Sequence, residues 1–332
     1  MAICILLLLI YSSTAIAASS VAFHIDRNLV ITGSKHQSEV IHFDSPMDSA
    51  LLSWNLFMPA DGYVKFQLRA KRAKGGWTSW FTMGVMNEQK GWTSVSGQNN
   101  NQGRVEVDTL ILKRPAENWQ YRVITKGSQK AGWPNVVNVA LAAKNSQAFS
   151  KSDSGKRVRS LVVPAISQFE EASREGKPEL GGRICSPTSS VMALRYNGIK
   201  IPSLIDYSMG VFDKDGDMFG NWAFNTAGLY NGLVRKRPGN TVATYLRWYS
   251  SFDDLLTNVA GGQPVIVSIK YGKGELDGAP NPTPGHLLLI RGADSKYVYV
   301  NDPAMPTDSK VSTRYKRDQF VKAWKGVAYV IE

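Results

Sequence analysis

The hydrophobic pattern of this chain changes character once, and that change sets what the chain can fold into. From about residue 21 to residue 142, apolar and polar side chains alternate in short runs, most clearly over Tyr63–Lys71. Turn-forming sequences such as Pro59-Ala60-Asp61-Gly62 separate the runs. A period of two is typical of half-buried β-strands, and many short strands without helices favour an antiparallel sandwich. We therefore expect an all-β, jelly-roll-like domain over residues 19–143.

A different pattern follows the stretch 144–159, which is polar, small and basic and predicts a linker. Beyond it, Ser251 begins a helix with a capping-box-like start, and that helix ends at Gly261-Gly262. Buried strands are predicted at 264–269, 286–291 and 297–301. Helices first and a block of strands afterwards indicate an α+β domain over residues 160–332.

The first 18 residues predict an export signal. Residues 3–10 form an unbroken apolar run that is short for a membrane span, and Ala15-Ile16-Ala17 is a small-x-small cleavage site. No Lys or Arg precedes the run, so the segment could also stay as an anchor. Both outcomes predict a secreted or cell-surface protein. Cys4 lies in this leader, so Cys185 is the one cysteine expected in the mature chain, which excludes an internal disulfide.

Net charge and tryptophan content suggest partners for the first domain. The formal charge of +12 fits affinity for anionic wall polymers, although a solvated basic face is an equal alternative. Exposed tryptophans could stack on glycans, but most tryptophans in such a domain belong to its core. No nucleic-acid module or phosphate loop is present, and export also argues against a nucleic-acid partner. The tryptophans of this domain are Trp54, Trp77, Trp80, Trp92, Trp119 and Trp133.

Cys185 stands directly before a predicted helix. Pro187 suits the first turn, Ser186 can cap it, and Asn197-Gly198 ends it. Unpaired N–H groups and the positive end of the helix dipole favour a thiolate at that position. A lone cysteine can equally be a small core residue, so the catalytic interpretation requires partners.

A cysteine nucleophile needs a base, and the base needs a group that orients it. The second domain contains one histidine, His286, at the start of a predicted strand. If this strand and the next form a hairpin centred on Asp294, His286 pairs with Asp302; a slip of one residue brings Asn301 or Pro303 there instead. In the favoured register the carboxylate fixes the imidazole tautomer and stabilises the imidazolium.

One further residue completes the predicted site, and no metal is added to it. Gln168 lies upstream, and its side-chain amide could join the Cys185 N–H in holding a developing oxyanion.

The acidic run Asp213–Asp217 does not fit a calcium loop, because its glycine comes too early and no Glu closes it. One cysteine and one histidine are too few for a zinc site. We therefore predict no metal.

These motifs occur in a familiar order: Val-Pro-x-Ile-x-Gln, then Cys-x-Pro-Thr-Ser, then Gly-His with three hydrophobic residues, then Asn-Asp-Pro. The order resembles the bacteriocin-processing ("double-glycine") cysteine peptidases, family thirty-nine of the cysteine class, and more closely their stand-alone secreted relatives with a papain-like fold. The resemblance implies that Gln168 is the oxyanion donor, Cys185 the nucleophile, His286 the base and Asp302 its orienter, with no cofactor.

The first domain resembles the β-rich front part of some exported members in Ser53-Trp54-Asn55, Trp77–Trp80 and Val107–Leu110. Bacteriocin-processing members are fused to a membrane exporter with a nucleotide-binding domain, and no stretch of this sequence resembles one. Cleavage of leader peptides is therefore not carried over.

The sequence thus predicts an exported cysteine peptidase that hydrolyses peptide or amide bonds of a peptide or protein substrate. Two alternatives stay open. The same triad could serve a cell-wall amidase or an acyl or peptidyl transferase. The protein could instead bind a surface through its first domain and carry an inert peptidase-like second domain.

Overall fold

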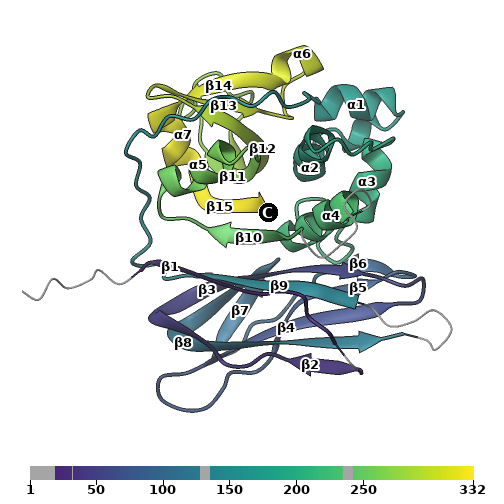
Figure 1. The fold of residues 1–332 in the computed structure, drawn as a ribbon, viewed down its shortest axis with the longest axis vertical. Coiled ribbons are helices and arrows are strands. Elements are labelled where there is room, and N and C mark those ends of the chain that lie inside the picture. The colour runs from purple at the N-terminus through teal and green to yellow at the C-terminus, as the bar shows by residue number, and fades with distance from the viewer. Residues whose placement is uncertain (1–18, 32, 128–134, 235–241) are drawn as a thin grey trace, which may run out of the picture.

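The structure, a computed structural model, describes residues 19–31, 33–127, 135–234 and 242–332 (Figure 1). The predicted export signal with Cys4, and also Trp133, lie outside these residues. The described chain forms a β domain followed by a domain of mixed helices and strands, which confirms the predicted change of fold class. Among the described helices, none is both long enough and apolar enough to cross a membrane.

The first domain is built on one antiparallel sheet, in which nine strands are described. Its strands are β1 (Val21–Asp26), β2 (Lys35–Gln37), β3 (Ile41–Phe57), β4 (Tyr63–Lys71), β5 (Phe81–Asn87), β6 (Gly91–Thr93), β7 (Gly103–Glu106), β8 (Thr109–Lys126) and β9 (Asn135–Lys144). The strand order is β1-β9-β3-β8-β4-β5-β6, and β2 and β7 also pair with β8. The alternating run that predicted a strand at Tyr63–Lys71 is β4 with those same bounds.

Two long strands, β3 and β8, carry the core of this domain. Their mutual register breaks on both sides of Met47, and such irregularities bend strands. Trp54 of β3 stacks on Phe66 of β4 with ring centroids 4.0 Å apart, and Trp119 is fully buried. In Figure 1, β1, β9, β5 and β6 lie nearer to the second domain, and β8 and β2 lie farther away.

The described tryptophans of the β domain offer little open ring surface. Trp54 and Trp119 belong to the core, and Trp92 is buried against Phe224 of the second domain. The guanidinium of Arg69 lies 4.4 Å from the Trp77 ring and 4.3 Å from the Trp80 ring. Arg122 lies 4.4 Å from the ring of Trp80 as well. These cation–π contacts occupy ring faces that a sugar would need. Glycan binding by this domain remains a prediction. The covered faces of these rings give it no support.

The second domain contains a six-stranded antiparallel sheet in the order β10-β15-β11-β12-β13-β14. Its strands are β10 (Thr244–Trp248), β11 (Val265–Tyr271), β12 (Thr283–Ala293), β13 (Tyr297–Asn301), β14 (Ser312–Lys316) and β15 (Trp324–Ile331). The helices are α1 (Gln168–Arg174), α2 (Cys185–Tyr196), α3 (Leu204–Gly210), α4 (Trp222–Val234), α5 (Phe252–Ala260), α6 (Asp308–Val311), α7 (Arg317–Ala323) and a 3-10 turn, η1 (Pro178–Leu180).

Several predicted elements of this domain have the expected ends. The Ser251 hydroxyl accepts a hydrogen bond from Asp254 N–H and caps α5, which stops before Gly261. Strand β13 has its predicted bounds, and β11 and β12 extend the predicted strands by a few residues. Both kinds of signal are local, because a cap and an apolar run act on neighbouring residues.

The two domains pack directly on each other through α4 and β10, which cover β3 and β9 (Figure 1). The Asn55 amide donates to the Thr244 carbonyl over 2.9 Å, and Thr244 N–H donates back to Asn55 Oδ1 over 3.1 Å. Leu246 N–H donates to the Ser53 hydroxyl over 3.1 Å. All four residues lie in buried positions, so polar side chains of the β domain replace strand partners along β10.

The segment between β9 and α1 follows the surface of the second domain. Arg317 Nε donates to Asp153 over 2.7 Å, and Val158 N–H donates to the Ala293 carbonyl over 2.8 Å. Leu161 N–H donates to the Arg291 carbonyl over 2.7 Å. The predicted linker boundaries at 144 and 159 stay predictions. From Asp153 to Leu161, these bonds attach the segment to the second domain.

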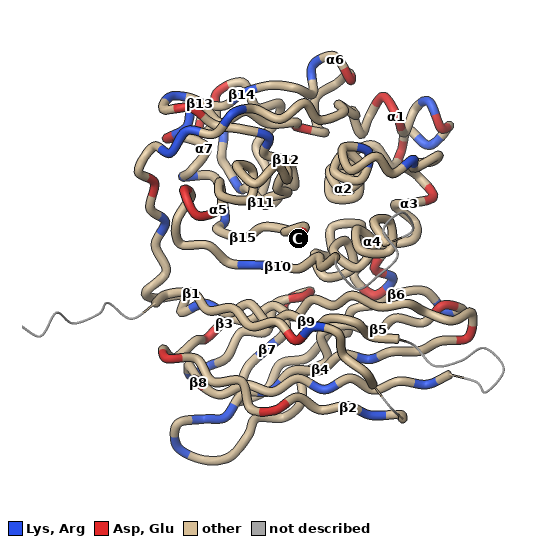
Figure 2. Tube along the Cα trace, viewed as in Figure 1, with Lys and Arg blue, Asp and Glu red and all other residues tan. Residues whose placement is uncertain are grey.

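Charged residues of both signs are interspersed over both domains, as Figure 2 shows. On the outer rows of β4 and β8, paired residues are mostly basic or amide side chains: Lys65, Gln67, Arg69, Lys71, Gln120 and Arg122. The excess of +12 is therefore carried partly by the strands of the first domain.

Candidate active site

Cys185 is the first residue of α2. Residues Ser186–Leu194 of this helix are buried, so its N-terminus is held firmly in the domain, while Cys185 itself is partly exposed. Pro187 lies in the first turn, and α2 ends at Asn197 before Gly198, as predicted. The predicted Ser186 cap is wrong: the Ser186 hydroxyl lies 2.9 Å from the Tyr329 hydroxyl instead, and Ile184 precedes the helix without a side-chain cap. The first N–H groups of α2 therefore remain uncapped beside the thiol.

His286 lies on β12, and α2 packs on this strand. The Ser189 hydroxyl donates to the Leu287 carbonyl over 3.2 Å, which fixes the helix against the strand next to the histidine. In this arrangement the His286 imidazole lies close enough to Cys185 to stabilise the thiolate. Burial alone raises the pKa of the thiol, but the neighbouring imidazole of His286 and its positive charge outweigh it and hold the pKa below its usual range.

Asp302 follows β13 directly, and its Oδ1 lies 2.7 Å from Nε2 of His286. The aspartate is fully buried and the histidine nearly so. Burial disfavours the charged form of each residue, yet their mutual attraction raises the pKa of His286 well above its usual range and lowers that of Asp302. With Nε2 engaged by the carboxylate, the other ring nitrogen is left for the thiol.

The predicted hairpin register between β12 and β13, which was to pair His286 with Asp302, is wrong. Ile290 pairs with Val300, where the prediction paired Leu288 with Val300, and a β-bulge between Ile290 and Gly292 shifts the register further along. The turn runs from Asp294 to Tyr297, and the Asp294 carboxylate accepts from Lys296 N–H and Tyr297 N–H. The turn centre thus lies beyond Asp294.

His286 and Asp302 meet nonetheless, because the observed strand register differs from the predicted one by two residues. A shift by two residues keeps each side chain on its face, so Asp302 becomes a diagonal neighbour of His286 on the same face. His286 itself pairs with Ile269 of β11.

Tyr315 is a site residue that the sequence did not reveal. Its hydroxyl donates to Oδ2 of Asp302 over 2.6 Å, and Ala304 N–H donates to Oδ1 over 2.9 Å. The tyrosine is buried on β14, the edge strand beside β13. Strand β14 returns only after a turn and the short helix α6, and no local motif predicts that topology. The alternating pattern of Ser312–Lys316 alone could have placed Tyr315 on the buried face.

Gln168, the predicted oxyanion donor, is the first residue of α1 and lies beside the same segment. Its N–H donates to the Pro303 carbonyl over 2.9 Å. Its side chain is buried, and Oε1 has no hydrogen-bond partner among the described residues. The main chain therefore brings Gln168 next to Asp302-Pro303, and no hydrogen bond between its carboxamide and Cys185 is found there.

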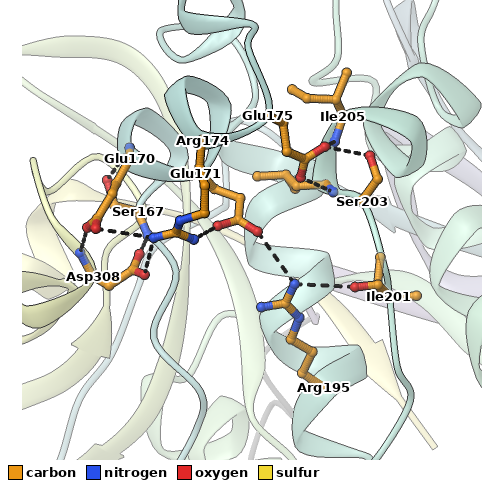
Figure 3. A network of polar contacts seen from close by, with 11 residues as sticks. Ser167, Glu170, Glu171, Arg174, Glu175, Arg195, Ile201, Ser203, Ile205 and Asp308 are labelled. Atoms are coloured by element: carbon orange, nitrogen blue, oxygen red, sulfur yellow. Dashed lines mark hydrogen bonds and ion pairs between the residues drawn. The ribbon is translucent and has the colours of Figure 1, made fainter.

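A polar network fixes this helix start (Figure 3). The Ser167 hydroxyl caps α1 by accepting from Glu170 N–H over 3.2 Å and donates to the Met305 carbonyl over 2.6 Å. Ser167 N–H donates to Asp308 over 2.6 Å, and Asp308 N–H donates to Glu170 over 2.7 Å. Arg174 bridges Glu170 and Asp308. The segment after Asp302 and the helix that carries Gln168 thus hold each other in place.

An open cavity of about 790 Å³ lies in front of Cys185. We call it the interdomain cavity, because both domains line it. Its second-domain side includes Cys185, Phe219, Trp222, Trp248, Ser268, Leu287 and Lys325, and its first-domain side is formed by Glu106–Thr109 and Ile111. Cys185 is therefore accessible from this cavity.

The acidic run at 213–217 joins the two domains. Asp213 is buried and accepts from Ser94 N–H and from the Asn221 amide, each over 2.8 Å. Asp215 accepts from Ser96 N–H over 2.6 Å. Asp217 forms an ion pair with Arg183, close to Cys185 in sequence, over 2.9 Å. Among the described residues, no group of three or more His, Cys, Asp or Glu could hold a metal ion.

Comparison with known proteins agrees with this architecture. A family profile described as "Peptidase_C39 like family" matches residues 160–331, and one described as "Peptidase C39 N-terminal domain" matches residues 31–144. No curated protein matches the chain. A crystal structure described as a C39-like peptidase from Bacillus anthracis is 20% identical with a TM-score of 0.37, and covers 53% of this chain and 98% of its own.

The peptidase domain of Streptococcus ComA, described as a bifunctional ABC transporter of a quorum-sensing pathway, is 17% identical with a TM-score of 0.30. That match covers 45% of this chain and 91% of the other. The family profiles confirm both the predicted resemblance and the predicted fold class, a β-rich domain before a papain-like α+β domain. Because the first profile alone spans more than half of the 332 residues, this chain belongs to the Peptidase_C39 like family.

Proposed function

We propose that this protein is an exported cysteine peptidase in which Cys185, His286 and Asp302 form the catalytic triad. Family membership supports peptidase function in general. The observation that carries the finer proposal is the buried His286–Asp302 pair, with Oδ1 2.7 Å from the imidazole, placed where His286 lowers the pKa of the Cys185 thiol. A partly exposed cysteine with a lowered pKa, at a helix start and facing a cavity, is the setting of a reactive thiol.

In the proposed reaction, the Cys185 thiolate attacks the carbonyl carbon of a peptide or amide bond and forms a tetrahedral intermediate. The Cys185 N–H and the Gln168 amide hold the developing oxyanion. His286 passes its proton to the leaving amine as the C–N bond breaks, which leaves a thioester on Cys185. His286 then removes a proton from water, the hydroxide attacks the thioester, and the free carboxylic acid leaves with the thiolate restored.

Asp302 acts by holding the imidazole in one orientation and by stabilising its positive charge throughout the cycle. Because the carboxylate is fully buried, its interaction with the imidazolium is little screened by water. No step in this sequence requires a redox change.

Export is part of the proposal, and it rests on the predicted signal at residues 1–18. The substrate we expect is a peptide or protein outside the cytoplasm. The positive net charge is consistent with a location at an anionic cell surface.

The proposed function is tested with the mature protein and its Cys185→Ala variant on β-casein, an unstructured protein, in water enriched in ¹⁸O. Hydrolysis predicts new peptide termini that carry one ¹⁸O atom, and the variant should produce none. If added glycinamide is incorporated in place of water, the triad serves a transferase. If casein remains intact while purified peptidoglycan releases peptides, the triad serves an amidase. Equal results for both proteins would contradict catalysis by Cys185.

A further inference from the structure

We propose that the turn between β7 and β8 in the first domain, residues Glu106–Thr109, is part of the substrate-binding site, and that Val107 contacts an apolar side chain of the bound peptide. This inference rests on the proposed function and extends it. It gives the β domain a direct role in selecting the substrate.

The position of the turn carries the inference first. The turn lines the same interdomain cavity as Cys185, so a chain bound at the thiol passes beside it. The β domain and the peptidase domain are also in direct contact along α4 and β10.

The turn is also fixed at that position. Asp108 is buried, and its Oδ2 accepts a hydrogen bond over 2.8 Å from Trp222 N–H, at the start of α4. The positive end of the helix dipole favours a carboxylate there. Asp108 thus anchors the turn of one domain to a helix of the other, and the wall that the turn forms is preorganised.

The backbone of the cavity wall is strained. Among the described residues, three that are not glycine have a positive φ, and two of them, Val107 at 57° and Asp217 at 43°, line this cavity. A β-branched residue in the left-handed region is an uncommon and costly arrangement, and such strain gathers at binding sites. Val107 nevertheless remains 40% exposed. The protein therefore maintains a strained backbone that presents an apolar group to the cavity.

On the second-domain side of the cavity, two lining residues carry buried polar atoms without a hydrogen-bond partner. The Ser268 hydroxyl and the Trp248 indole N–H both belong to residues that line the cavity, and neither atom has a hydrogen-bond partner among the described residues. Ser268 and Trp248 are 1% and 5% exposed. Buried donors without partners are costly, and because both atoms are closed to solvent, a peptide carbonyl oxygen would satisfy them only after their side chains turn toward the cavity.

These features define the ligand by its chemistry. Val107, Ile111, Phe219 and Leu287 form apolar lining, and the unpartnered donors require acceptors. An extended peptide with an apolar side chain offers both. A small amide without a side chain would offer an acceptor but no apolar group.

The test measures how fast Cys185 is alkylated by chloroacetyl-Leu-Leu-amide and by chloroacetyl-Ala-Ala-amide, with chloroacetamide as the baseline for each protein. In this reaction the sulfur displaces chloride and forms a thioether. The full-length mature protein is used at pH 9, where even an ordinary thiol with a pKa of about 8.5 is largely ionised. The rates therefore report fit to the cavity, whether or not Cys185 is catalytic.

We expect the wild-type protein to prefer the Leu-Leu reagent by about tenfold, and Val107→Gly to lose most of that preference, since apolar side-chain contacts in a pocket are worth such factors. Glycine accepts a positive φ without strain, so the variant should keep the wild-type Tm. Val40→Gly removes an exposed valine of the same domain that does not line the cavity, and it should keep the full preference.

Two results would overturn the inference: a wild-type protein without preference, or a Val107→Gly variant that retains it. Failure of the proposed function has a different signature. In that case the pH dependence of iodoacetamide labelling would be that of an ordinary thiol, while the preference for Leu-Leu persists.

Discussion

The Tyr315 hydroxyl donates a 2.6 Å hydrogen bond to Oδ2 of Asp302, so this carboxylate is held from two sides, by the tyrosine and by His286. The tyrosine lowers the pKa of Asp302 together with the histidine, against the effect of burial. A charged acceptor that is fully buried depends on each of its donors.

Replacing Tyr315 by Phe should therefore weaken the triad without touching the thiol. We expect kcat to fall by about tenfold and the free energy of unfolding to drop by about 1–2 kcal/mol, because a hydrogen bond to a charged group is lost. The matched control is Tyr299→Phe, which removes a 2.6 Å bond to Asp294 on the same sheet outside the site. Kinetics and urea titrations of both variants provide the measurement. Equal kcat values for the two variants would contradict a positioning role for Tyr315.

Gln168 should stabilise the transition state and contribute little to substrate binding. Because its buried carboxamide is proposed to hold the oxyanion, Gln168→Ala should lower kcat by about 10²–10³-fold and leave KM nearly unchanged. The rate of iodoacetamide labelling at Cys185 should stay at the wild-type value, since that reaction develops no oxyanion. Gln147→Ala, at an exposed glutamine, serves as the control. A loss of labelling would instead indicate that Gln168 maintains the structure of the site.

Asp108 should make stability depend on pH. Burial raises the pKa of this carboxyl to about 6, although Trp222 N–H and Lys325 act in the opposite direction. An acid with a raised folded pKa binds more protons when folded, so stability falls as the pH rises from about 3.9, the unfolded value, through the folded value. Asp108→Asn keeps an acceptor for Trp222 N–H and cannot ionise.

We therefore expect Asp108→Asn to raise the free energy of unfolding by about 2 kcal/mol at pH 8 and by much less at pH 4. Urea titrations at the two pH values give both numbers, and Asp44→Asn, at an exposed aspartate, should show neither change. A gain of equal size at both pH values would mean that desolvation of the charge is not the cause.

Of the two aspartates that bond to the first domain, Asp213 and Asp215, Asp213 should contribute more to the free energy of unfolding. Its removal in Asp213→Ala leaves buried donors from Ser94, Gly216 and Asn221 without their acceptor. We expect a loss of about 3 kcal/mol and faster cleavage by trypsin, against less than about 1 kcal/mol for the exposed Asp215→Ala. Similar losses for both variants would show that burial of Asp213 adds nothing.

How far the sequence predicts this site depends on how local each signal is. Cys185 at a helix start and His286 at a strand start were predictable, because helix-start chemistry and apolar runs act over a few residues. The meeting of His286 with Asp302 was predicted from a register that proved wrong, and it survived because the error was an even number of residues.

The remaining features depend on long-range topology. Tyr315 reaches Asp302 only because β14 returns beside β13. Ser186 lies inside α2, and its hydroxyl contacts Tyr329 of β15, far away in the sequence. Val107 lines the cavity because the two domains dock, and no pattern in its neighbourhood indicates that docking. Such contacts join residues far apart in the chain, where propensity and spacing carry no information.

The account depends most directly on the pairing of Cys185 with His286, and the pH dependence of iodoacetamide alkylation tests it on the mature protein and on His286→Ala. The lowered pKa of the thiol and the raised pKa of the imidazole predict a thiolate–imidazolium pair between those two values. The wild-type protein should react well below about pH 7, and the variant should need a pH above about 8. If both proteins react only near about pH 8.5, Cys185 is an ordinary thiol and the proposed catalytic triad is wrong.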